Sequence, residues 1–226
     1  KHKQDAPHAW PPPSYNQPVQ YTAPLDDSAP LSPSGITHLQ EIIGVLLYYA
    51  HTVDSTMLIA LGTLASAQSQ GTESTTQAAT QLLNYCMTHP DAITRFQASD
   101  MILHVHSDAS YLSETKANSC AGSYSYLSMA LVDPTIAPTA ATPLPPHNGP
   151  ILVHSSIMPT VLSSATEAET GALFYNAKEA TVLHTTLLEL GYPQPPTPIQ
   201  TDNLCTIGII NDMVHQHCSK AMDMHF

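Results

Sequence analysis

The chain has 226 residues, 42% of them hydrophobic, which is enough for one large or two small domains with packed cores. Six basic residues face 18 acidic ones, giving a formal net charge of −12; this argues against strong nucleic-acid affinity, because Lys and Arg normally neutralise the phosphates. No run of about 18 apolar residues and no signal-peptide core occur, so we expect no membrane span and an intracellular location, cytoplasmic or nuclear, without secretion.

The four cysteines, at positions 86, 120, 205 and 218, form no CxxC pair. We interpret them as reduced thiols in a reducing compartment. An alternative is a zinc set in the last part of the chain, but its intervals match no common zinc spacing. Its members would be Cys205, His215, His217 and Cys218.

The first part of the chain is rich in proline and then becomes helical in pattern. Residues 1–34 read as an extended linker or the tail of a preceding domain. Residues 35–91 predict a small helical subdomain, because apolar residues recur at helical spacing in three segments. Asp54 is the expected N-cap of the second segment. The predicted helices span about residues 36–50, 54–65 and 72–88, and we interpret the subdomain as a scaffold.

Residues 92–226 show the pattern of a domain that combines strands and helices. The alternation over Met101–Asp108 predicts a buried strand, with Leu103 and Val105 on one face and His104, His106 and Asp108 on the other. Further strands are expected at about 92–98, 120–132, 151–157 and 198–201, with a Pro-rich surface loop at 133–150.

A long helix is predicted between the last two of these strands. Ser164 and Glu167 form an S-x-x-E capping box, and Gly191 marks the stop after Leu190. Glu169 lies on the apolar stripe that should pack on the sheet, whereas Glu167 lies off it and caps the helix. A carboxylate on a core-facing stripe is costly unless it is paired or binds a metal. We therefore expect Glu169 to point inward as a ligand.

Two of the predicted strands end in acidic residues. Asp108 closes the strand that begins at Met101, and Asp202 follows the strand that begins at Pro198, ahead of a short helix from Leu204 to about Asp212. Asp202 or Asn203 could equally cap that helix. With Glu169, these residues supply the clustered carboxylate oxygens that hard cations prefer. The set predicts a site for Mg²⁺, with Mn²⁺ as the substitute ion.

Taken together, these segments resemble the RNase H domain of copia-type retrotransposon polyproteins, and the resemblance covers about residues 36–226. The matching motifs are His106-Ser-Asp-Ala-Ser-Tyr111, Ala121-Gly-Ser-Tyr124, Leu162-Ser-Ser-Ala-Thr-Glu-Ala-Glu169, Pro196-Thr-Pro-Ile-Gln-Thr-Asp-Asn203 and Ser219-Lys-Ala-Met-Asp-Met-His-Phe226. The upstream segment Leu39–Ala50 is similar to the part that joins reverse transcriptase to RNase H in those polyproteins. Each motif is weak, but their shared order and spacing are specific.

The resemblance implies an α/β fold, an RNase H-like mixed sheet flanked by helices, preceded by the helical connection subdomain. It implies an endonuclease that cleaves RNA in RNA–DNA hybrids by two-metal-ion hydrolysis, with the rest of the polyprotein as a further partner. Asp108, Glu169 and Asp202 match three family acids that are catalytic and bind the metals. The fourth acid is expected beyond Phe226, in a last strand and helix, and Asp223 is not assigned to the site.

Several features favour a different outcome. The shortage of cations, with Cys or His at positions where the family often has Arg or Lys, is typical of a degenerate copy. The alternative hypothesis is therefore an inactive remnant that acts as a structural or binding module of the polyprotein. His106 could also shuttle a proton beside Asp108, although a histidine on a sheet face more often serves packing.

Overall fold

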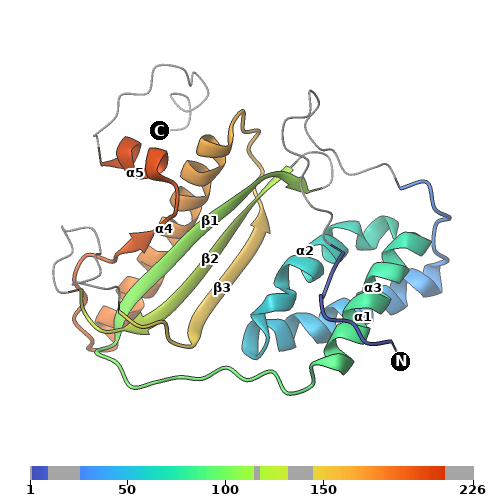
Figure 1. Ribbon diagram of the computed structural model, residues 1–226, viewed down its shortest axis with the longest axis horizontal. Helices are drawn as coiled ribbons and strands as arrows, with labels where there is room; N and C mark the ends of the chain where they lie inside the picture. Colours follow the sequence, from blue (N-terminus) through green and yellow to red (C-terminus); the bar gives the residue numbers. More distant parts are fainter. Residues whose placement is uncertain (1, 10–25, 115–117, 132–144, 212–226) are drawn as a thin grey trace. The chain divides into compact units, whose positions relative to one another are not determined.

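The computed structural model describes residues 2–9, 26–114, 118–131 and 145–211. The chain divides into two compact units (Figure 1). The helical unit comprises Lys1–Thr94 and Glu114–Ala117, and the sheet unit comprises Arg95–Ser113 and Asn118–Phe226. In the described part of the chain, no helix combines the length and the apolar character needed to cross a bilayer.

The helical unit contains the three helices that the periodicity predicted. They are α1 (Pro33–Thr52), α2 (Leu58–Ala67) and α3 (Glu73–Thr88), and two short 3₁₀ turns flank α2. Asp54 accepts a hydrogen bond from the Thr56 backbone N–H and caps the 3₁₀ turn that leads into α2. It was expected to cap the helix itself, but α2 begins at Leu58 after Met57, which makes no side-chain cap bond. The core of this unit is aliphatic and includes Leu39, Ile43, Met57, Leu61 and Leu82.

The sheet unit is an α/β structure with a mixed four-stranded sheet in the order β3-β2-β1-β4. Its strands are β1 (Ile102–Glu114), β2 (Asn118–Ser128), β3 (Pro150–Ile157) and β4 (Ile199–Gln200). Strands β2 and β3 are antiparallel, whereas β1 and β4 are parallel. The long helix α4 (Ala165–Glu189) lies along one face of this sheet, and the short α5 (Leu204–Ile210) lies beside α4 (Figure 1).

The alternation predicted for the first strand is confirmed in β1. Leu103 and Val105 pack with Ala180 and Leu187 of α4, which places them on the helix-covered face. The rings of His104 and His106 instead lie near the ring of Tyr126 on β2. Burial of the apolar residues under α4 stabilises the unit, at roughly 25 cal/mol per Å² of apolar surface removed from water.

Several predicted strands differ from those of the structure, and the one expected at 120–132 is β2 (Asn118–Ser128), which begins two residues earlier and ends four residues earlier. The strand expected at 92–98 is wrong, because these residues have no regular secondary structure and form no sheet pairing. β1 continues to Glu114, six residues beyond the expected end at Asp108, and β4 has two residues rather than four. Local β-propensity does not reveal whether a neighbouring strand is present to pair with, which is what creates or prolongs a strand.

Candidate metal centre

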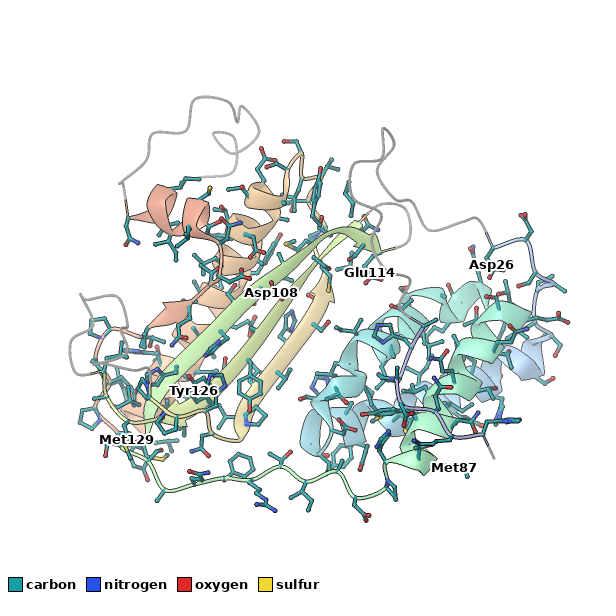
Figure 2. All side chains as sticks on the ribbon, in the orientation of Figure 1. Asp26, Met87, Asp108, Glu114, Tyr126 and Met129 are labelled. Carbon is teal, nitrogen blue, oxygen red and sulfur yellow. The ribbon has the colours of Figure 1, made fainter. Side chains whose placement is uncertain are left out.

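Asp108, within β1, and Asp202, in the turn after β4, lie at matching positions relative to the pairing of these two parallel strands. The pairing of β1 with β4 joins Val105 to Ile199 and His106 to Gln200. Asp108 and Asp202 each follow the second of these pairs by two residues. Because parallel strands run in the same direction, equal offsets from one pair bring the two residues to neighbouring positions just beyond the paired segment. Both residues are exposed, and Figure 2 marks Asp108 on β1.

The short helix after β4 is capped by Asn203. The side chain of Asn203 accepts a hydrogen bond from the Thr206 backbone N–H at 3.0 Å, and Asn203 is the N-cap of α5. The sequence left Asp202 and Asn203 as equal candidates for this cap. With Asn203 in the capping position, the carboxylate of Asp202 is available for a different role.

Glu169 lies near the start of α4 and is only 9% exposed. The start of this helix is fixed at Ser164, whose side chain accepts a hydrogen bond from the Glu167 backbone N–H at 3.2 Å. The last helical residue is Glu189, Leu190 is the C-cap, and the following Gly191 has a φ of 89°, as the predicted stop requires. These two ends fix the length of α4, and the packing of its buried residues Ala168, Ala172 and Ala180 fixes which face, with Glu169, points inward.

Glu167 is also buried, at 3% exposure, which the apolar stripe did not predict. Its Oε2 accepts hydrogen bonds from the backbone N–H and the hydroxyl of Ser163, both at 2.7 Å. The expected capping box is therefore modified, because the glutamate side chain binds Ser163 instead of the N-cap Ser164. Glu167 and Glu169 are distinguished by the partners of their carboxylates rather than by burial.

The structure brings together all three predicted site residues. Asp108, Glu169 and Asp202 each contribute one carboxylate oxygen, and these three oxygens lie within 4.8 Å of one another. They come from β1, α4 and the turn after β4. The sequence separates them by many tens of residues, so their convergence is produced by the tertiary fold. Among the described residues, this is the one group of His, Cys, Asp and Glu side chains arranged closely enough to share a metal ion.

Without a bound cation, the three clustered carboxylates are electrostatically unfavourable. Burial, together with repulsion from the nearby carboxylates of Asp108 and Asp202, raises the pKa of Glu169 to about 7, although a hydrogen bond from the Ala109 backbone N–H acts in the opposite direction. Oε2 of Glu169 is buried and has no hydrogen-bond partner among the described residues. A buried, unpaired carboxylate oxygen is costly, and protonation or a bound cation would relieve the cost.

The donor set fits a hard divalent cation. All three side chains offer carboxylate oxygens, which Mg²⁺ and Mn²⁺ prefer, and none offers sulfur or imidazole nitrogen. The exposure of Asp108 and Asp202 gives solvent access, while the unpartnered oxygen of Glu169 supplies an acceptor on the buried side. The residues present are therefore suited to Mg²⁺ or Mn²⁺.

A cluster of aromatic and imidazole rings lies on the sheet face that carries His104. Tyr126 is fully buried, and its hydroxyl is 3.2 Å from Nε2 of His106. Burial lowers the pKa of His106, and the neighbouring His147 and His104 lower it further. His104 is bound through Nε2 to the carbonyl oxygen of Met129 at 2.8 Å. These contacts are those of packed residues, and the proton-shuttle role of His106 stays a prediction.

Some residues named from the sequence lie outside the described part of the chain. They are Asp223 and three members of the alternative zinc set, His215, His217 and Cys218.

Asn176, a buried residue of α4, was not singled out from the sequence. The signal that could have identified it is its position seven residues after Glu169, a polar residue on the same stripe of α4.

Comparisons of the chain with protein-family models, with curated proteins and with solved structures gave no match.

Proposed function

We propose that the sheet unit is an RNase H-like endonuclease domain of a copia-type retrotransposon polyprotein, which cleaves the RNA strand of RNA–DNA hybrids. The observation that carries this proposal is the convergence of Asp108, Glu169 and Asp202, whose carboxylate oxygens lie within 4.8 Å of one another. The motif order given above and the mixed sheet flanked by helices support the same assignment. The helical unit would be the segment that connects this domain to a reverse transcriptase.

Each acid would have a distinct task in this proposal. Glu169, held by the buried start of α4, would bind from the protein side, and its orphan Oε2 would gain a partner. Asp108 and Asp202, both exposed, would bind from the side open to substrate. Bound divalent ions would supply activation of the attacking water and stabilisation of the leaving oxygen. Selectivity for a hybrid would come from groove shape and 2′-hydroxyl contacts rather than from base sequence.

The experiment that tests this function is a cleavage assay on a labelled RNA–DNA hybrid with Mg²⁺ or Mn²⁺. Asp108→Asn keeps the side-chain size but removes a charged ligand, and we expect it to abolish cleavage. Glu179→Gln is the matched control, because Glu179 is an exposed carboxylate on the same helix as Glu169 and is not part of the cluster. Cleavage that survives Asp108→Asn would contradict the proposed site.

A second candidate function is favoured by the charge of the chain. Six basic residues against 18 acidic ones leave little positive charge to neutralise nucleic-acid phosphates. In this case the sheet unit would be an inactive remnant that acts as a structural or binding module of the polyprotein. A wild-type protein that binds Mn²⁺ at the cluster but neither binds nor cleaves the hybrid would favour this second function.

A further inference from the structure

A buried asparagine joins α4 to the two central strands of the sheet. Asn176 is 1% exposed, and its Nδ2 donates hydrogen bonds to Oγ of Ser107 at 2.8 Å and to the carbonyl oxygen of Gly122 at 2.9 Å. Ser107 belongs to β1 and Gly122 to β2. One carboxamide therefore fixes the helix against both strands at a single point.

Asn176 has an unfavourable feature that packing does not explain. Its Oδ1 is buried and has no hydrogen-bond partner among the described residues. An unpaired buried amide oxygen costs free energy, so an apolar side chain of similar size would serve packing better. The residues that flank it on the same face of α4 are Ala172 and Ala180, both small, apolar and buried. This contrast indicates that the two directional hydrogen bonds have a role of their own.

The two bonds lie next to the acidic cluster. Ser107 immediately precedes Asp108, and Asn176 follows Glu169 by seven residues, which is about two helical turns on the same face. The Asn176–Ser107 bond thus connects the side chain next to Asp108 in β1 to the helix that carries Glu169. Apolar contacts can slide along a helix, whereas a hydrogen bond of fixed length and direction resists sliding.

We propose that Asn176 is a positioning residue for the metal centre. Its bonds to Ser107 and Gly122 set the position of α4 along the sheet, and this position sets the separation between Glu169 and Asp108. The inference rests on the proposed function in so far as the cluster binds a divalent cation. Asn176 itself would touch neither the cation nor the substrate.

The test is Mn²⁺ binding by the full chain, measured by isothermal titration calorimetry. Asn176→Leu keeps a similar volume and removes both donors, and Ser107→Ala removes one acceptor with a smaller change. We expect Asn176→Leu to weaken Mn²⁺ binding about tenfold, the lower end of the effect seen when groups that orient metal ligands are removed. Ser107→Ala should weaken binding in the same direction but by less.

The control variant must disturb the packing of α4 without touching the bond. Leu187→Ala is suitable, because Leu187 packs on Leu103 and Val105 and follows Glu169 by eighteen residues, roughly 27 Å along the helix. We expect it to lower the melting temperature while the Mn²⁺ affinity stays at the wild-type value. A structural role for Asn176 would give the same result as Leu187→Ala, with lower stability and unchanged affinity, and that result would overturn the proposal.

A second measurement separates this inference from the function proposed above. The Ala109 backbone N–H donates to Oδ1 of Asp108 at 2.8 Å and also to the Glu169 carboxylate, so its hydrogen exchange reports how closely β1 and α4 approach without any metal. Exchange of this amide should accelerate in Asn176→Leu and not in Leu187→Ala. If the wild type binds no Mn²⁺, the metal centre is wrong, and this exchange comparison still decides the positioning role. Equal exchange in both variants would reject it.

Discussion

Asp108 and Asp202 are equivalent in position: each stands two residues beyond the His106–Gln200 pair that joins β1 to the parallel strand β4. This equivalence places two carboxylates together at the end of the paired segment. Glu169 approaches them from α4, and the three oxygens lie within 4.8 Å of one another. Like charges at this separation repel, so the arrangement costs free energy in the metal-free protein.

The first prediction concerns metal-dependent stability. Mn²⁺ or Mg²⁺ should raise the melting temperature of the wild type, because a ligand that binds the folded state adds about 2.7 kcal/mol at a concentration of one hundred times Kd. Asp108→Asn should lose this increase, whereas Glu179→Gln should keep it. Differential scanning calorimetry with and without each ion measures the effect, and an equal increase in Asp108→Asn would argue against the cluster as the binding site.

The second prediction concerns pH in the absence of metal. The pKa of Glu169 is about 7 in the folded protein, against an ordinary value of 4.5. Between these values the folded state holds a proton that the unfolded state has lost. The free energy of unfolding should therefore fall by on the order of 3 kcal/mol as the pH rises through this window. The stabilisation that comes from the protonated Glu169 should be fully present below pH 4.5.

Urea unfolding with a chelator present, repeated from pH 4 to pH 8, measures this dependence. Glu169→Gln carries no titrating proton, so its unfolding free energy should lack the decline attributed to Glu169. The comparison of the two proteins matters because the histidines also titrate in this range. If the unfolding free energies of the wild type and Glu169→Gln depend on pH in the same way, the pKa of Glu169 is not raised and the prediction is wrong.

The third prediction concerns acid and the buried His104. Burial lowers the pKa of His104 below its ordinary 6.5, so the unfolded state takes up a proton before the folded state does. The associated stability is present above pH 6.5 and is lost as the pH falls toward the folded pKa. His104→Gln can still donate to the Met129 carbonyl but does not titrate, and it should lose less stability on acidification. Unfolding measured at pH 7.5 and pH 5 compares the two, and equal losses would contradict the assignment.

The fourth prediction separates two buried glutamates on one helix. Glu167 and Glu169 are 3% and 9% exposed, but the Glu167 carboxylate is bound by Ser163 and lies outside the acidic cluster. Glu169→Gln should abolish the Mn²⁺-dependent rise in melting temperature, whereas Glu167→Gln should retain it. Both variants keep the side-chain size, so calorimetry compares them directly. Loss of the metal response in both would show that burial in α4, rather than membership of the cluster, is the relevant property.

Much of the fold follows from local patterns. The apolar spacing predicted α1, α2 and α3, the S-x-x-E motif and Gly191 predicted the ends of α4, and alternation assigned Leu103 and His104 to opposite faces. These features depend on neighbours within a few residues, so they can be read from the sequence. The false strand at 92–98 shows the limit, because strand formation also requires a partner.

For the candidate site too, local sequence patterns predicted one part and tertiary packing decided the rest. Strand ends and a helix stripe identified Asp108, Glu169 and Asp202 as residues of interest, and the sequence order made them a set. Their distances, the choice of Asn203 over Asp202 as the cap of α5, and the different partners of Glu167 and Glu169 were decided by packing. The bond of Asn176 to Ser107 likewise joins residues 69 positions apart. Contacts between distant segments depend on how the helix lies on the sheet, and no local pattern encodes that placement.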